Sequence, residues 1–379
     1  MQAEKRMRTL HRLAGIAGLV AVLLQSRYAS GDENRGAAPK VEEGTAWYDV
    51  STWGVEGKAW SDTKRYFDRL PGKAEGVARG PVWSLSRHSA GMAARFKTDA
   101  SRISVRYVLL SESVAMPHMP ATGVSGVDLY AKNERGQWRW LGITRPDSKN
   151  VRADLASDIT AVKREYMAYL PLYNGVESLE IGVPEQAAFE PLPPRSDKPI
   201  VFYGTSILHG GCASRPGMAF PAILGRRLDR PTINLGFSGN GKMDPEVGGW
   251  MAEIDAAAYV IDCLPNMTGP EVAERAEPLV RQLRAEHPQT PIVLVEDRTY
   301  SNAEFKPSSQ ERHSTSRAAL KAAYERLVSG GVTGLSYLEG EHLLGDDGEA
   351  TVDSSHPSDL GMMRMADALE PVLRKALGK

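Results

Sequence analysis

The chain has 379 residues, with 46 Lys and Arg against 47 Asp and Glu, and 42% of its residues are hydrophobic. This is the composition of an ordinary globular protein, and it excludes a collagen-like chain, a coiled coil and a wholly disordered protein. The net charge of −1 lacks the basic footprint typical of nucleic-acid-binding proteins. The length exceeds the ~250–300 residues at which a single core stops growing, so we expect two domains.

The first 30 residues have the layout of a secretory signal peptide. Basic residues stand at positions 5, 6, 8 and 12, an apolar run covers 13–24, and small residues follow at 29–31. The run is shorter than the ~20 residues that a spanning helix needs, so we expect export with no stable membrane span after cleavage. Residues 31–45 are polar and lack a hydrophobic period, which predicts a linker.

Residues 46–191 have the texture of a β-rich domain. Residues 103–108 alternate apolar and polar side chains, and similar short segments occur at 126–130, 138–142 and 178–183. Gly, Asn and Pro separate them, a pattern that favours an antiparallel β-sandwich. Six of the seven tryptophans lie here, and we expect them in the sandwich core and at its rim. A sugar-stacking platform is the alternative interpretation of these aromatic residues.

A proline-rich hinge at 191–199 precedes a second domain, residues 192–379, of different texture. Apolar strands are expected at 200–203, 232–235, 259–264, 291–295 and 335–338. Amphipathic helices are expected between and after them, notably at 270–286, 314–328 and 360–377. Alternation of strands and helices predicts an α/β domain with a parallel sheet covered on both faces.

Polar residues stand where these strands end, which is where an open α/β sheet places its site. Ser206 follows the first strand, Gly239 the second and Asn266 the third, while Asp353 and His356 precede the last helix. Acyl transfer needs a nucleophile, a base, a residue that orients the base, and oxyanion donors. Taken singly, each residue also has an ordinary structural explanation, as a helix cap or a turn residue.

The same residues resemble the four blocks of the SGNH/GDSL hydrolase superfamily. The blocks are Gly204-Thr205-Ser206-Ile207, Asn234-x-Gly236-x-Ser238-Gly239, Asn266 and Asp353-x-x-His356-Pro357. The resemblance implies a flavodoxin-like three-layer domain. Ser206, Asp353 and His356 would be catalytic, and Ser206, Gly239 and Asn266 would form the oxyanion hole. The first block departs from Gly-Asp-Ser-Leu, and the third, Leu264-Pro265-Asn266-Met267, departs from Gly-x-Asn-Asp.

Both departures resemble one bacterial subgroup of the superfamily. That subgroup carries an N-terminal β-domain with a Gly-x-Asp-Leu-Tyr motif, which Gly126-Val127-Asp128-Leu129-Tyr130 matches here. Matches in two separate domains strengthen the assignment.

Other residues are less determined by their pattern. Arg215 and His118 are candidates for substrate binding, with an acid pair for Arg215 and a surface position for His118 as alternatives. Neither a metal-ligand cluster nor a phosphate loop is recognisable, so we expect no metal and no cofactor. For Cys212 and Cys263, free buried thiols are favoured over a disulfide.

These observations predict an exported serine esterase. Its substrate would be a small-molecule or carbohydrate ester with a small acyl group such as acetyl. The carbohydrate part of this prediction rests on analogy with the superfamily's extracellular members. A lipase or thioesterase of the same superfamily is one alternative, and a non-catalytic carbohydrate-binding protein is another.

Overall fold

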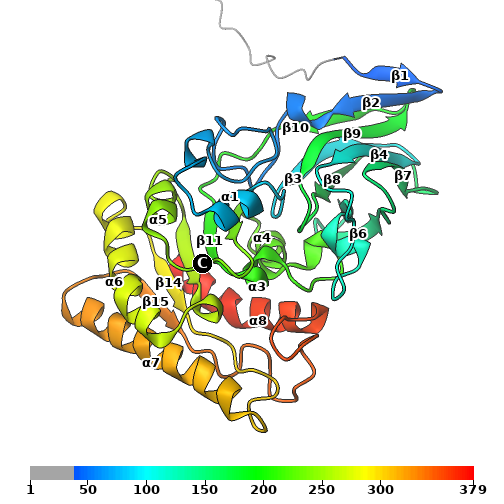
Figure 1. Cartoon of the computed structure of the whole chain (residues 1–379). Coiled ribbons are helices and arrows are strands. Elements are labelled where there is room, and N and C mark those ends of the chain that lie inside the picture. Colours follow the sequence, from blue (N-terminus) through cyan, green and yellow to red (C-terminus); the bar gives the residue numbers. More distant parts are fainter. Residues whose placement is uncertain (1–37) are drawn as a thin grey trace, which may run out of the picture. The chain divides into compact units, whose positions relative to one another are not determined.

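The computed structural model of the chain describes residues 38–379, which belong to one compact unit (Figure 1). The predicted signal peptide, residues 1–30, lies outside the described residues. Within 38–379, none of the helices combines the length and the apolar composition needed to cross a membrane.

Two antiparallel sheets make up the N-terminal part of the structure, called here the β part (residues 38–192). Their strands, in spatial order, are β1 (Lys40–Glu42), β2 (Thr45–Asp49), β9 (Val176–Pro184), β4 (Ile103–Leu109) and β7 (Asn150–Ala156) in the first sheet. The second sheet has β10 (Phe189–Leu192), β3 (Ala93–Thr98), β8 (Arg164–Tyr169), β5 (Asp128–Lys132) and β6 (Trp138–Ile143).

The alternation predicted for residues 103–108 is confirmed by strand β4. Ile103, Val105, Tyr107 and Leu109 are all buried in the core between the two sheets. Two bounds differ from the prediction. Residues of the predicted linker form strand β1, because they pair with β2. The predicted hinge begins inside β10, where Pro191 is tolerated because β10 is an edge strand.

A five-stranded parallel sheet organises the C-terminal part, called here the α/β part (residues 200–379). Its spatial order is β12 (Thr232–Gly236), β11 (Ile200–Gly204), β13 (Ala258–Asp262), β14 (Ile292–Val295) and β15 (Leu335–Leu338). This is the 2-1-3-4-5 order of flavodoxin-like folds, so the predicted fold class is confirmed. The chain leaves β11 toward one neighbour and returns on its other side, which creates a crevice beyond its carboxyl end.

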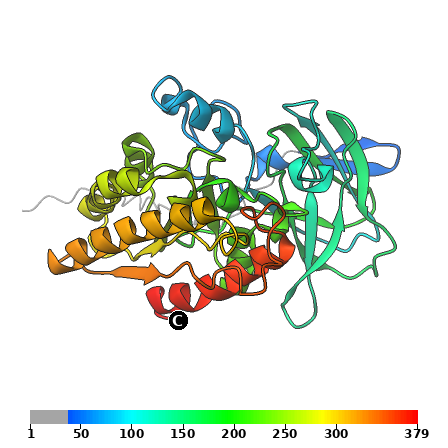
Figure 2. The same ribbon diagram turned by 60° about the horizontal axis from the view of Figure 1, so that its bottom comes forward.

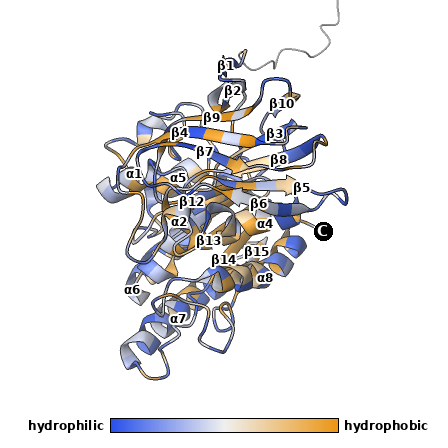
Figure 3. Cartoon of the chain, turned by 90° about the vertical axis from the view of Figure 1, so that its right-hand side faces the viewer, coloured by the Kyte–Doolittle hydropathy of each residue, from blue (hydrophilic) through white to orange (hydrophobic). Residues whose placement is uncertain are grey.

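Helices cover both faces of this sheet. One face packs against α5 (Pro245–Met251), α6 (Gly269–Glu286) and α7 (Pro307–Ser329). The other packs against α3 (Ser206–His209), α4 (Phe220–Leu228) and α8 (Asp359–Ala376). Helices α6 and α7 lie side by side (Figures 1 and 2), and hydrophilic residues are frequent along both (Figure 3).

Two element bounds differ from the sequence prediction for identifiable reasons. Helix α7 begins at Pro307 rather than at residue 314, because proline suits the first turn of a helix. Strand β13 ends at Asp262, and residues Leu264–Asn266 form a short 3-10 helix instead of continuing the strand. The apolar character of Cys263 and Leu264 reflects burial in the helix-covered core and not strand pairing.

The segment between β2 and β3 contains α1 (Gly80–Ser86) and packs against the α/β part. Trp60, Leu70 and Val82 share a core with α5 and α6, and the Trp60 Nε1–H donates to Glu253 at 3.1 Å. Trp83 also packs against this core. The expectation that all six tryptophans serve the sandwich is therefore wrong for Trp60 and Trp83. Their apolar surface is covered by helices that lie far along the chain.

Candidate active site

Ser206 is the first residue of α3, directly beyond the carboxyl end of β11. The preceding Thr205 caps this helix, since its side-chain oxygen accepts a hydrogen bond from the Ile207 N–H at 3.3 Å. Ser206 is therefore free of the capping role, and its Oγ lies 2.8 Å from Nε2 of His356. This contact joins residues 150 positions apart in the sequence.

His356 is oriented by Asp353 on the same turn. Asp353 Oδ2 lies 2.8 Å from His356 Nδ1, and Oδ1 accepts the N–H groups of Ser355 and His356 at 3.1 and 2.7 Å. Burial alone would raise the pKa of Asp353, but the hydrogen bonds from His356 and the Ser355 N–H lower it. A carboxylate beside Nδ1 places the ring proton there and leaves Nε2 to accept the Ser206 proton. Helix α8 has Ser358 as its N-cap, so Asp353 does not cap it.

Gly239 and Asn266 come from the loops after β12 and β13. Gly239 has φ +69°, and a Cβ built on it would meet no atom within 4 Å, so the approach to this residue is open. The Asn266 Oδ1 accepts the Gly241 N–H at 3.1 Å, which leaves its amide nitrogen to donate. Within residues 38–379, neither that nitrogen nor the Gly239 N–H has an acceptor in reach. Both groups can therefore donate to an oxyanion.

Gly241 lets these two loops approach the nucleophile turn. A Cβ at Gly241 would stand 2.0 Å from the carbonyl oxygen of Gly204, so a larger residue would push the loop away.

The two substrate-binding candidates occupy different places. His118 is exposed, and its ring centroid lies 6.0 Å from that of His356, so this loop of the β part reaches the site. His118 therefore lies both at the surface and beside the site, so its two interpretations do not exclude each other. Arg215 forms the acid pair that was its alternative interpretation, because its Nη1 donates to the buried carboxylate of Asp128 at 3.0 Å and also to Tyr130.

The Gly-x-Asp-Leu-Tyr motif therefore joins the β part to the α/β part, through hydrogen bonds that its Asp128 carboxylate accepts. Besides Arg215, the Asp128 carboxylate accepts the Gly217 N–H and the Trp140 Nε1–H, each at 2.8 Å. Burial raises the pKa of Asp128, and the Arg215 charge opposes that shift.

Sequence reasoning missed Tyr173. Its hydroxyl donates to the Ser206 carbonyl at 3.2 Å, and its ring stacks on His209 with centroids 4.2 Å apart. Arg69, also missed, is buried and donates to the carbonyls of Asn234 and Gly236 at 2.9 and 2.8 Å. Burial lowers the pKa of Arg69 to about 9. No local pattern marks either residue, because the partners lie in the other part of the structure.

A buried cluster of charged side chains lies at the carboxyl ends of β13 and β14. It consists of Asp262, Asp297 and Arg298, each at most 2% exposed. Arg298 pairs with Asp297. Burial, and then the neighbouring Asp297 charge, raises the pKa of Asp262 well above its usual range.

Both cysteines are free and buried, as the favoured prediction had it. Cys212 is 6% exposed, and Cys263 is fully buried with its Sγ 3.7 Å from the Tyr203 carbonyl oxygen.

Comparison with known families and structures agrees with this geometry. Residues 197–374 match the GDSL-like lipase/acylhydrolase family, and residues 45–189 match the N-terminal region of SGNH-hydrolase-type esterases, a family named for Gly-x-Asp-Leu-Tyr. A crystal structure described as a GDSL-like lipase from Bacteroides ovatus ATCC 8483 is 34% identical, with a TM-score of 0.84. The match covers 88% of this chain and 98% of that chain. The chain belongs to the GDSL-like lipase/acylhydrolase family. As a GDSL-family chain, it is a carboxylic ester hydrolase.

More distant structures share the fold of this GDSL-family chain. A salicylyl-acyltransferase from a tetracycline biosynthetic pathway is 17% identical, with a TM-score of 0.66, covering 90% of this chain and 93% of that chain. An acetyl xylan esterase from Butyrivibrio proteoclasticus is 11% identical, with a TM-score of 0.55, covering 88% of this chain and 99% of that chain. A comparison with curated proteins finds no match.

Proposed function

We propose that this chain is an exported serine esterase that removes small acyl groups, acetyl in particular, from carbohydrate through an acyl-enzyme on Ser206. The observation that carries the proposal is the 2.8 Å contact between Ser206 Oγ and His356 Nε2. A serine hydroxyl becomes an effective nucleophile only beside such a base. Asp353, on the far side of the ring, completes the arrangement.

In the proposed reaction, Ser206 Oγ attacks the ester carbonyl while His356 Nε2 takes its proton. The carbonyl oxygen becomes an oxyanion, which the Ser206 and Gly239 N–H groups and the Asn266 amide stabilise. Collapse of this intermediate breaks the ester C–O bond, and His356 returns the proton to the departing alcohol. Water, deprotonated by His356, then attacks the acyl-enzyme and releases the acid and free Ser206.

The open side of the site supports a bulky alcohol such as a sugar. The approach to Gly239 is unobstructed, and the His356 side chain retains 25% exposure. His118 adds an exposed imidazole from the β part that can hydrogen-bond to hydroxyl groups. Fold neighbours include an acetyl xylan esterase and a family two carbohydrate esterase from Cellvibrio japonicus. Export is proposed from the signal-like pattern of residues 1–30.

The test is hydrolysis of p-nitrophenyl acetate, of a long-chain p-nitrophenyl ester and of acetylated polysaccharides, with acetate release measured. We expect turnover of the acetyl substrates, with a preference for acetate over the long acyl chain. Ser206→Ala should lower kcat by up to ~10⁶-fold and leave the melting temperature unchanged. Full activity of purified Ser206→Ala would refute the acyl-enzyme, and a preference for long chains would favour a lipase.

A further inference from the structure

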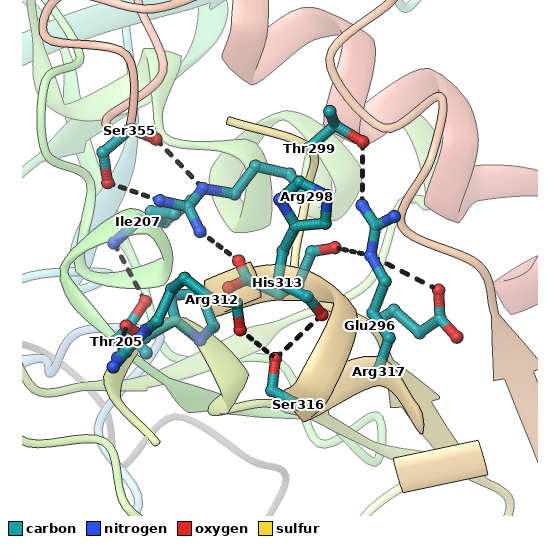
Figure 4. A network of polar contacts seen from close by, with 12 residues as sticks. Thr205, Ile207, Glu296, Arg298, Thr299, Arg312, His313, Ser316, Arg317 and Ser355 are labelled. Carbon is teal, nitrogen blue, oxygen red and sulfur yellow. Dashed lines mark hydrogen bonds and ion pairs between the residues drawn. The ribbon is translucent and has the colours of Figure 1, made fainter. Parts of the chain in front are cut away.

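The turn that carries Asp353 and His356 is held by hydrogen bonds from Arg298 to Ser355 (Figure 4). Arg298 follows β14, and its Nε donates to the Ser355 carbonyl oxygen at 3.1 Å. Its Nη2 donates to the Ser355 hydroxyl as well. One guanidinium therefore holds both the backbone and the side chain of the residue immediately before His356.

The turn from Asp353 to His356 contains an unfavourable backbone conformation. Ser354 has φ +70°, in the left-handed region that costs an ordinary residue free energy. A second contact from the same loop supports it, since the Ser301 N–H donates to the Ser354 carbonyl at 3.1 Å. External hydrogen bonds to Ser354 and Ser355 thus oppose relaxation of the turn.

Arg298 is itself fixed in place. Its side chain is 1% exposed and pairs with the fully buried Asp297, while the guanidinium lies 4.0 Å from the Tyr300 ring centroid. A buried, paired guanidinium has little freedom, so the fork that it presents to Ser355 is rigid. The ammonium of a lysine lacks this planar set of donors and could not hold both Ser355 groups in the same geometry.

We propose that Arg298 is a positioning residue, which keeps His356 within hydrogen-bond reach of Ser206 by holding the turn at Ser355. Its side-chain hydrogen bonds go to Ser355 and Asp297, and not to Ser206 or His356. The inference rests on the proposed function, because it assigns Arg298 to the acid–base turn of that same site.

The experiment compares Arg298→Gln and Arg298→Lys with Arg317→Gln as the matched control. The Arg317 Nε donates to the backbone carbonyl oxygen of Asp297 at 2.8 Å, and its Nη2 donates to the Thr299 hydroxyl. Arg317 makes no hydrogen bond to Ser355. We expect kcat for p-nitrophenyl acetate to fall by up to ~10²-fold in both Arg298 variants, with KM within about threefold. Arg317→Gln should keep kcat near the wild-type value even if its melting temperature falls.

Two further variants guard against misfolding. Ser355→Ala removes one of the two Arg298 contacts without touching the buried ion pair, and should lower kcat by about 2–10-fold. Ser354→Asn, which favours the left-handed region, should restore part of the kcat lost in Arg298→Lys. Wild-type kcat in the Arg298 variants, or an equal loss in Arg317→Gln, would overturn the positioning role.

A second readout separates this proposal from the proposed function. The rate at which a fluorophosphonate labels Ser206, followed by intact mass, reports the nucleophile without requiring ester turnover. If the wild type hydrolyses no ester but is labelled, the substrate proposal fails while Arg298 is still tested by the labelling rate. If the wild type is neither active nor labelled, both proposals fail.

Discussion

The hydroxyl of Tyr173 donates a hydrogen bond of 3.2 Å to the backbone carbonyl of Ser206. Tyr173 lies between β8 and β9, so a residue of the β part supports the turn that carries the nucleophile. Helix α3 has only four residues, far too few to be stable by itself. Its position therefore depends on contacts from outside, and Tyr173 supplies one at each end, through Ser206 and through the ring of His209.

Tyr173→Phe should lower kcat by about 2–10-fold, the equivalent of one net hydrogen bond, with little change in KM. Tyr107→Phe is the matched control, because its hydroxyl donates to the Ser125 carbonyl oxygen at 3.0 Å and makes no hydrogen bond to α3. Steady-state kinetics and melting temperatures of both variants decide the matter. Equal kinetic losses in the two variants would show that Tyr173 acts only through general stability.

Asn266→Ala should reduce kcat by about 10²–10³-fold with little effect on KM, because an oxyanion donor acts mainly on charge formed in the transition state. Asn266→Asp sharpens the test. It keeps the oxygen that accepts the Gly241 N–H but removes the donor and adds a negative charge, so its loss should be at least as large. A change confined to KM in both variants would instead identify Asn266 as a substrate-binding residue.

Asp128→Ala should destabilise the protein by about 3–5 kcal/mol, since it leaves Arg215 without its buried partner. Asp255→Ala provides the comparison, because Asp255 is 67% exposed and pairs with Lys198 at the surface, where a pair contributes less than about 1 kcal/mol. Urea unfolding measures both losses. Similar losses of unfolding free energy in the two variants would contradict the role of the Gly-x-Asp-Leu-Tyr motif in joining the two parts.

Asp262→Asn should stabilise the protein, and more at pH 8 than at pH 5. The pKa of Asp262 is raised in the folded state, so its contribution is most favourable below the unfolded pKa of about 4 and is lost as the pH rises toward the folded pKa. The neutral amide avoids that loss. Each 1 kcal/mol relieved should raise Tm by about 1–2 °C.

Calorimetry at both pH values tests this prediction, with Asp297→Asn as the contrast. That substitution breaks the ion pair with Arg298 and should lower Tm at pH 8. A Tm difference for Asp262→Asn that is the same at pH 5 and pH 8 would show that Asp262 does not titrate as described.

The predicted site residues are brought together because their placement follows from local rules. Ser206, Gly239 and Asn266 each follow a strand of one parallel sheet, and the carboxyl ends of such strands share an edge. Asp353 and His356 are three residues apart, which lets one turn join them. These rules need only the order of strands along the chain and the spacing within one loop.

The sequence by itself determined the fold class, the family and the residues that meet at the edge of the sheet. The tertiary structure alone decided what holds them there. Tyr173 reaches Ser206 across 33 residues, Arg298 reaches Ser355 across 57, and Arg215 reaches Asp128 across 87. A hydrogen bond between such distant partners leaves no periodicity in either segment. Such a hydrogen bond forms because packing buries both groups, and a buried polar atom without a partner would cost free energy.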